Sequence, residues 1–211
     1  MGPCGFFWDL DGTLVDSYPA IVPVAKELCD ELGLGYSAEY IYAYACRSSI
    51  GALLEEAAEK LGCNASGLKS RFNARNDRAI DAIRPIPHAK ETLAALARAG
   101  HRHFMYTHRG ASCGAILERT GLAPYFTEVL TALDGFPRKP APDAILYLMG
   151  RHRLAPERCW YIGDRSLDVL AAENAGIRSV LLYPPGSPTE KTGRETLVIE
   201  DLSQLPDLIG R

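Results

Sequence analysis

Short apolar runs of the strand type alternate with amphipathic helical segments along most of this chain, and this alternation limits the possible folds more than any other feature. The strand-like runs lie at residues 4–10, 103–107, 128–132, 159–162 and 179–183, with a weaker one at 197–199. Helical patterns lie at residues 89–99, 112–120, 141–150 and 168–175. Strand alternating with helix is typical of an α/β fold with a Rossmann-like, doubly wound parallel sheet. On such sheets ligands bind at the carboxyl ends of the strands.

The alternation stops between residues 17 and 84, where one helical pattern follows another without a convincing strand. These patterns cover residues 18–32, 38–44, 50–61 and 67–83. Pro85 and Pro87 end the interval before the sheet pattern resumes. A chain of 211 residues is long enough for one α/β domain and a modest insertion. We therefore predict a core of residues 1–16 and 85–211, with residues 17–84 inserted as an all-helical cap over the ligand-binding end of the sheet.

Charge and cysteine content exclude several classes of partner. The formal net charge is only −3, which gives no general attraction to nucleic acid or to an anionic membrane. No stretch approaches the length that spans a bilayer, and the first residues lack the pattern of a secretory signal. The six cysteines show no CxxC spacing, which favours reduced thiols over a disulfide framework. We therefore expect a cytoplasmic monomer or homodimer without nucleic-acid or membrane partners.

Two acids stand at the end of the first strand, in the segment Trp-Asp-Leu-Asp-Gly. Side chains two residues apart on an extended strand point the same way, so Asp9 and Asp11 can face one pocket. Gly12 then permits a sharp turn of the backbone. Two carboxylates so close together repel each other, and their burial is costly unless a cation compensates. The pair therefore indicates a divalent metal site.

A third acid, Asp164, follows the strand predicted at residues 159–162. With Asp9 and Asp11 it could converge on a hard cation, and a few carboxylate ligands with room for water and phosphate suit Mg²⁺. Asp168 opens the next predicted helix. An acid there is favoured by the helix dipole, and a role in the second coordination shell of the metal is compatible with that position.

Two further strand ends carry groups that bind anions. Thr107, His108 and the turn after them offer a hydroxyl and backbone N–H groups that lead into a helix, which suits a phosphate group. Lys139 precedes a helix that begins after proline, and from there it can reach the same pocket. The acid pair, hydroxyl, lysine and second acid pair thus fall at the ends of four separate strands.

In that order the motifs resemble those of the haloacid dehalogenase superfamily of phosphatases. Within it, the chain resembles the subclass that has a helical cap between the first two motifs, and in particular its phosphoglycolate phosphatase-like members. The resemblance covers nearly the whole chain. Its motifs are DLDGTLVDS at residues 9–17, the Thr107 segment, KPAPD at residues 139–143 and GDRSLDVLAAENAG at residues 163–176. It implies a phosphatase that hydrolyses a phosphate monoester of a small metabolite through an aspartyl-phosphate intermediate, with Mg²⁺ as cofactor.

The resemblance also implies a role for each motif residue. Asp9 would be the nucleophile, and Asp11 the general acid and base. Thr107, the His108 position and Lys139 would hold the transferring phosphoryl group. Asp164 would hold Mg²⁺ together with Asp9 and the backbone carbonyl of Asp11. A general acid at Asp11 indicates an oxygen leaving group rather than a halide, because halide departure needs no proton.

Several positions depart from the family pattern or remain open. His108 stands where relatives usually have asparagine. If only its backbone N–H binds phosphate, its imidazole has no role there. Arg109, the next residue, also stands near the predicted phosphate site. His88 replaces a usual glycine and is assigned a loop role. In the predicted cap, Arg47 is the candidate for binding the leaving group, with a plain surface arginine as the alternative. The rival functions are a sugar phosphomutase of the same superfamily and a non-catalytic binding protein with this fold.

Overall fold

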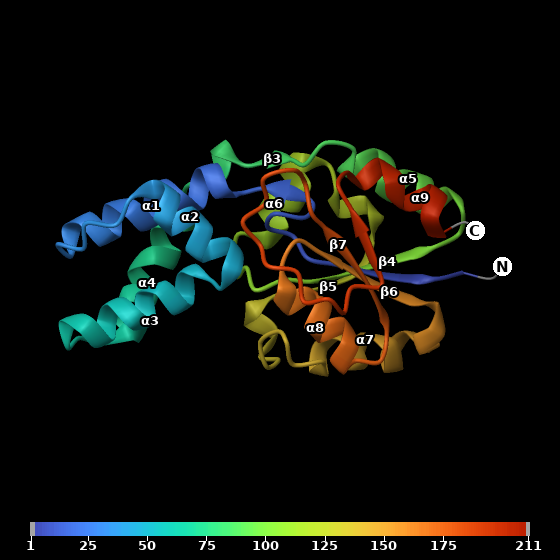
Figure 1. Cartoon of the computed structure of the whole chain (residues 1–211). Coiled ribbons are helices and arrows are strands. Elements are labelled where there is room, and N and C mark those ends of the chain that lie inside the picture. The colour runs from blue at the N-terminus through green and yellow to red at the C-terminus, as the bar shows by residue number, and fades with distance from the viewer. Residues whose placement is uncertain (1–2, 210–211) are drawn as a thin grey trace. The chain divides into compact units, whose positions relative to one another are not determined.

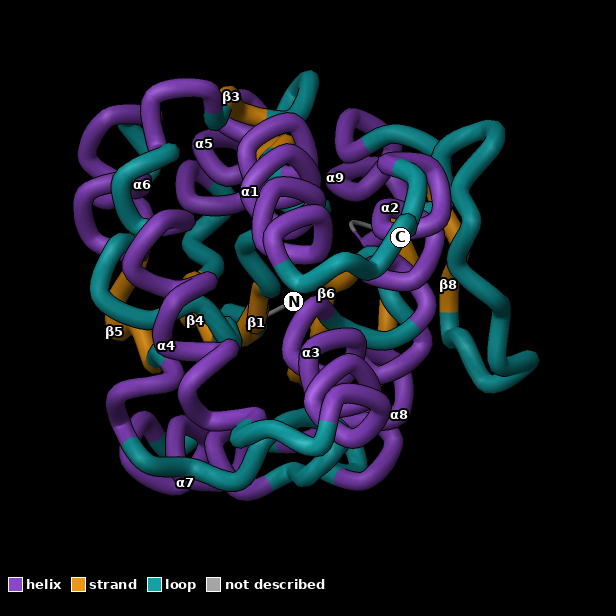
Figure 2. Tube along the Cα trace, turned by 90° about the vertical axis from the view of Figure 1, so that its left-hand side faces the viewer, coloured by secondary structure: helices purple, strands orange, loops and turns teal. Residues whose placement is uncertain are grey.

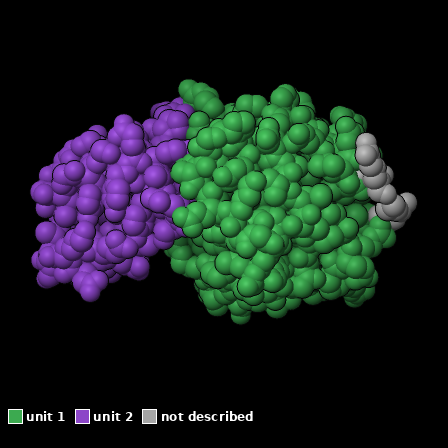
Figure 3. Space-filling model, viewed as in Figure 1, with its two compact units in different colours: residues 1–16, 84–211 green, residues 17–83 purple. Residues whose placement is uncertain are grey.

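The computed structural model describes residues 3–209, and the chain divides into two compact units (Figures 1 and 3). Unit 1 comprises residues 1–16 and 84–211, and unit 2 comprises residues 17–83. Residues 1, 2, 210 and 211, which the predicted core includes, lie outside the described part. No helix among the described residues is long and apolar enough to cross a membrane.

Unit 1 is built on a parallel six-stranded sheet with the order β5-β4-β1-β6-β7-β8. Its strands are β1 (Gly5–Trp8), β4 (Arg102–Tyr106), β5 (Phe126–Leu130), β6 (Cys159–Gly163), β7 (Arg178–Leu182) and β8 (Leu197–Ile199). All six were predicted, each end within two residues of its observed position. The first strand lies in the middle, since β1 pairs with β4 on one side and β6 on the other. The predicted Rossmann-like α/β class is confirmed.

Helices cover both faces of this sheet (Figure 2). They are α5 (Ala89–Arg98), α6 (Cys113–Thr120), α7 (Asp143–His152), α8 (Ser166–Asn174) and α9 (Leu205–Ile209), with short 3₁₀ turns at Ala123–Tyr125, Ala132–Asp134, Pro156–Arg158 and Leu202–Gln204. Helices α5, α6 and α9 lie on one face, and α7 and α8 on the other. Fully buried Phe7, Phe104 and Tyr161 pack with α7 and α8 in one apolar core. Burial on both faces is what a parallel sheet of near-continuous apolar strands requires.

A second, two-stranded sheet was not predicted. Strand β2 (Val15–Asp16) pairs antiparallel with β3 (Arg84–Pro85), and the backbone N–H of Ile86 extends the pairing to the carbonyl of Leu14. Strands of two residues are too short for a periodic pattern, so sequence gives no signal for them. The chain therefore leaves unit 1 and returns to it at paired positions.

Unit 2 is a bundle of helices with its own apolar core. It contains α1 (Tyr18–Glu31), α2 (Ala38–Arg47), α3 (Ile50–Leu61), α4 (Ala65–Asn76) and a 3₁₀ turn at Ile80–Ala82. Leu28, Ile41 and Leu54 are fully buried in that core. The side chains of Ser37 and Ser49 accept hydrogen bonds from the first turns of α2 and α3, which fixes where these helices begin.

The last helix of unit 2 differs from the prediction, which extended it over residues 67–83. Helix α4 ends at Asn76. The backbone N–H of Asp77 still bonds four residues back, and those of Arg78 and Ala79 bond to carbonyls three residues back. Such tightening is common where a helix ends, and the polar sequence of α4 gives no apolar period from which the end could be located.

The backbone conformation at His88 is one that favours glycine. Its φ of 63° lies in the left-handed region, which costs energy for residues other than glycine. The imidazole Nδ1 lies 2.7 Å from Oδ1 of Asp201, and the backbone carbonyl of His88 accepts the N–H of Thr92 at the start of α5. His88 thus lies in the loop that enters α5.

Candidate active site

The functional candidates of unit 1 lie where the central strands end. Asp9 directly follows β1, Thr107 follows β4 and Asp164 follows β6. The sheet's hydrogen bonds continue one residue beyond the strands, because the N–H of Asp9 donates to Ile162 and that of Thr107 to Leu130. The backbone at Asp9 and Thr107 is therefore fixed by the sheet itself.

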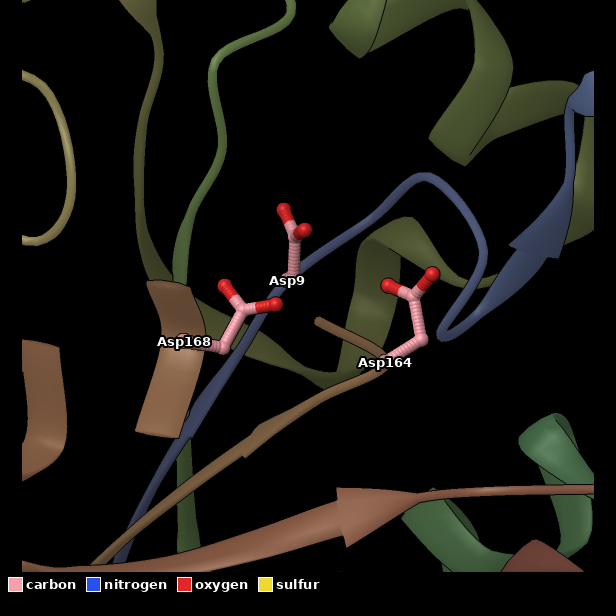
Figure 4. Close-up of side chains that lie close together, drawn as sticks. All are labelled: Asp9, Asp164 and Asp168. Carbon is pink, nitrogen blue, oxygen red and sulfur yellow. The ribbon is translucent and has the colours of Figure 1, made fainter. Parts of the chain in front are cut away.

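Three buried acids form the centre of the site (Figure 4). The carboxylates of Asp9, Asp164 and Asp168 point to the same side, and one oxygen from each lies within 4.8 Å of the others. Their exposed fractions are 1%, 7% and 1%. The sequence predicted Asp9, Asp11 and Asp164 as metal ligands and Asp168 in the second coordination shell, whereas the cluster in the structure contains the carboxylate of Asp168 and not that of Asp11.

Two buried cations face this cluster. The ammonium of Lys139 lies 3.0 Å from Oδ1 of Asp9 and 2.6 Å from Oδ1 of Asp168. It also donates to the Tyr161 hydroxyl at 3.1 Å. The guanidinium of Arg165 donates from Nη2 to Oδ2 of Asp9 at 3.2 Å. Asp9 is thus held on both oxygens by cations.

Burial and these cations set the protonation of the three acids. Burial alone would raise the pKa of Asp9, but Lys139 and Arg165 outweigh it and hold that pKa at about 2. Burial raises the pKa of Asp164 to about 7, although Arg165 opposes the shift. Burial also raises the pKa of Asp168, against the opposing charge of Lys139. The cluster therefore combines one carboxylate whose pKa is held low with two whose pKa values are raised by burial.

Gly12 and Gly163 lie so close to the acids that a larger residue at either position would clash with them. A Cβ atom on Gly12 would lie 2.2 Å from Oδ2 of Asp164, and φ at Gly12 is +80°. A Cβ atom on Gly163 would lie 2.3 Å from the Cβ atom of Asp168. The Thr13 hydroxyl then donates to Oδ1 of Asp164 at 3.0 Å, which orients that carboxylate. Both motifs therefore need glycine for close approach.

His108 has a defined partner in the structure. Its Nε2 accepts the backbone N–H of Lys139 at 2.8 Å. Burial, together with the positive charges of Lys139 and Arg138, lowers the pKa of His108 to about 2, so the imidazole is neutral and can accept this bond. Sequence reasoning favoured an incidental imidazole. The structure instead shows the ring supporting the backbone that carries Lys139.

The Asp11 carboxylate faces Arg109 rather than the three-acid cluster. Nε of Arg109 lies 3.0 Å from both carboxylate oxygens, and Nη2 lies 2.7 Å from Oδ1. The Arg109 side chain is 2% exposed and that of Asp11 21%. The Thr107 hydroxyl accepts the backbone N–H of Arg109 at 3.1 Å. The loop after β4 therefore connects Thr107, through Arg109, to the carboxylate of Asp11.

Sequence reasoning missed Arg165 and Tyr161. Arg165 directly follows Asp164, so its place beside a candidate ligand was available as a signal. Tyr161 lies within β6, and its hydroxyl donates to the carbonyl of Tyr106 while it accepts from Lys139.

Arg47 belongs to unit 2, where its Nε donates to the carbonyl of Ala43 one turn earlier in α2.

Comparison with known proteins identifies the class to which this fold and site belong. Residues 6–182 match the sequence model of the haloacid dehalogenase-like hydrolases. The chain therefore belongs to this family, which confirms the resemblance seen in the motifs and the prediction of a hydrolytic enzyme.

Within the family, the chain is phosphoglycolate phosphatase-like in sequence. It is 31% identical over 219 residues to the phosphoglycolate phosphatase of Vibrio vulnificus strain YJ016, with 96% of this chain and 94% of that protein covered. A hydrolase from Pseudomonas syringae matches at 27% identity and a TM-score of 0.77, covering 97% of both chains. A predicted phosphoglycolate phosphatase from Haemophilus somnus shares the fold, with a TM-score of 0.83 at 23% identity over 98% of this chain and 97% of that one.

Proposed function

We propose that this protein is a cytoplasmic, Mg²⁺-dependent phosphatase that hydrolyses a small phosphate monoester through a phosphorylated Asp9. The observation that carries the proposal is the state of Asp9, which is 1% exposed and yet kept ionised by Lys139 and Arg165. A buried, ionised carboxylate at the edge of the sheet suits a nucleophile. The six cysteines, which show no CxxC spacing, suit a reducing compartment.

In the first half of the reaction, an Asp9 oxygen attacks phosphorus as the bond from phosphorus to the ester oxygen breaks. The departing alkoxide takes a proton from Asp11 and leaves as the free alcohol. The products are an aspartyl phosphate on Asp9, the free alcohol and an ionised Asp11. Splitting the hydrolysis in this way replaces one difficult step with two easier ones.

In the second half, water attacks the phosphorus of the aspartyl phosphate and gives a proton to Asp11. The bond between phosphorus and the Asp9 oxygen breaks, which releases inorganic phosphate and restores both carboxyl groups. Asp11 thus serves as acid and then as base. Lys139, with the Thr107 hydroxyl, would bind the phosphoryl oxygens and stabilise their charge throughout.

The three-acid cluster fits a divalent metal. Its ligand oxygens lie within 4.8 Å of one another, and burial raises the pKa values of Asp164 and Asp168, so a cation would relieve the cost of ionising them. Asp9, Asp164 and the backbone carbonyl of Asp11 would hold the ion, with Asp168 close by. Bound Mg²⁺ would supply positive charge to the transferring phosphoryl group.

Unit 2 is the proposed cap that selects the substrate. It is compact, it has its own apolar core, and it is inserted between the two short strands β2 and β3. Arg47 in α2 is the proposed contact for an acidic or hydroxylated leaving group. Since several relatives are named phosphoglycolate phosphatases, phosphoglycolate is the first substrate to test.

The proposal is tested by phosphate release from p-nitrophenyl phosphate and a panel of phosphorylated metabolites, with Mg²⁺ and with EDTA. Wild type should turn over only with the metal, and Asp9→Asn should be inactive with an unchanged circular dichroism spectrum. Retained activity in Asp9→Asn would contradict the mechanism. Sugar-phosphate isomerisation without phosphate release would indicate a phosphomutase, and no turnover on any substrate would indicate a binding protein.

A further inference from the structure

Arg109 holds the carboxylate of Asp11 asymmetrically. Oδ1 lies 2.7 Å from Nη2 and 3.0 Å from Nε, whereas the contact of Oδ2 with this guanidinium is the 3.0 Å one to Nε. Two N–H groups of one planar guanidinium fix both the position and the rotation of a carboxylate. Oδ1 is therefore the more fully occupied oxygen, and Oδ2 keeps more of its capacity to exchange a proton.

Arg109 is itself fixed at both ends of its side chain. Its backbone N–H donates to the Thr107 hydroxyl at 3.1 Å, and its Nη1 donates to Oγ of Ser112 at 3.2 Å. The backbone carbonyl of Arg109 also accepts the N–H of Ala132. A buried guanidinium with these contacts is preorganised, so little of its conformational entropy is lost when it orients another group.

We propose that Arg109 is a positioning residue for Asp11, and that it directs Oδ2 of Asp11 toward the ester oxygen of the substrate. This inference rests on the proposed function, because it concerns the proton that Asp11 gives to the leaving group. Lysine could not replace Arg109, since a single ammonium does not fix the plane of a carboxylate. The aspartate, not the arginine, contacts the reacting atoms.

The contribution of Arg109 depends on the leaving group. When the ester bond of an alkyl phosphate breaks, the basic alkoxide must receive the Asp11 proton. A nitrophenolate ion is stable without that proton, so its departure gains little from a well-placed acid. The parameter kcat/KM covers the steps up to release of the leaving group, and it therefore isolates this half of the reaction.

The experiment compares Arg109→Gln and Arg109→Lys with wild type on phosphoglycolate and on p-nitrophenyl phosphate. We expect kcat/KM for the alkyl ester to fall by about 100-fold or more, and that for the nitrophenyl ester by less than about 10-fold, because a positioned general acid contributes factors of this size. The exposed Arg119 of α6 provides the matched control. Arg119→Gln should behave as wild type on both esters.

An equal loss on both esters, or no loss on either, would overturn the proposal. A double-mutant cycle gives a second test. The double variant Asp11→Asn with Arg109→Gln removes both charges of the pair, so neither charge is left without its partner. If Arg109 acts through Asp11, the double variant should match Asp11→Asn within about twofold, and a further loss would mean that Arg109 contacts the substrate itself. Retained turnover in Asp9→Asn would instead refute the phosphatase mechanism.

Discussion

In unit 1 the ion pairs at the sheet edge are buried, whereas the ion pairs of unit 2 lie on its surface. Lys139, Asp9 and Asp168 have side-chain exposures of 0%, 1% and 1%. In unit 2 the pairs of Lys26 with Asp30 and of Arg75 with Glu31 are 34–52% exposed. The core of unit 2 is made of apolar side chains.

The difference shows that the energetic cost of burying charge lies in unit 1. Burying charged groups is unfavourable unless each is paired, and a well-packed apolar core would often be more stable. Unit 1 nevertheless keeps the three carboxylates of the cluster and the cations that face them out of water at one edge of the sheet. The exposed ion pairs of unit 2 are screened by water and salt, so each contributes little to stability.

The largest effect is expected for Lys139→Met. The substitution leaves the Asp9 and Asp168 carboxylates buried beside an apolar side chain, which should lower the free energy of unfolding by about 3–5 kcal/mol. Phosphatase activity should fall by about 100- to 1,000-fold or more, because a fixed charge on the transferring group is lost. Urea denaturation and phosphate release measure the two effects. The control is Lys26→Met in unit 2, and a similar loss there would break the comparison.

Leu54→Ala should have the next largest effect, in unit 2. Leu54 is fully buried, and truncating it leaves a cavity, so the free energy of unfolding should fall by about 2–5 kcal/mol. Leu61, at the end of the same helix, is 42% exposed. Leu61→Ala should change stability by less than about 0.5 kcal/mol. Equal effects of the two substitutions would show that unit 2 lacks a packed core.

A buried histidine makes unit 1 sensitive to acid. Nδ1 of His103 accepts the indole N–H of Trp8 at 3.0 Å, and Nε2 lies 3.2 Å from the carbonyl of Leu93. Burial lowers the pKa of His103 from 6.5 to about 4 in the folded state. Below pH 6.5 the unfolded chain binds a proton that the folded chain does not, so stability falls as the pH falls from 6.5 to 4. The shift corresponds to about 3 kcal/mol over that range.

The measurement is the free energy of unfolding by urea at several pH values between 4 and 7. His103→Gln offers an acceptor to Trp8 without a titrating group, so its stability should depend less on pH than that of wild type in this range. Parallel curves for the two proteins would exclude His103 as the source of the acid sensitivity.

The smallest effect is expected for Glu31→Gln on the surface of unit 2. Glu31 pairs with Arg71 and Arg75, and these contacts lower its pKa, the hydrogen bond from Arg75 being the largest cause. Water and salt screen such exposed pairs. The unfolding midpoint should therefore stay at the wild-type value. A clear loss would show that the surface pairs of unit 2 are structural after all.

Much of the fold was predictable because strand and helix periods are local. The same locality placed Asp9, Thr107 and Asp164, since each directly follows an apolar strand. The pairing of Asp11 with Arg109 was not predictable, because it depends on how two loops 98 residues apart position their side chains. The left-handed backbone at His88 gave no signal in the residue type itself.

The short pair of strands β2 and β3 has a consequence for how such a chain can change. Asp16 and Arg84 are direct partners in that pair, so both ends of the segment between them are tied at one place in unit 1. The entropic cost of closing a loop grows only slowly with its length. Insertions, deletions or the exchange of the whole segment would therefore leave the sheet edge undisturbed. With the proposed role of unit 2 in substrate selection, this attachment would let substrate preference evolve by replacing one module while the carboxylates of unit 1 stay in register.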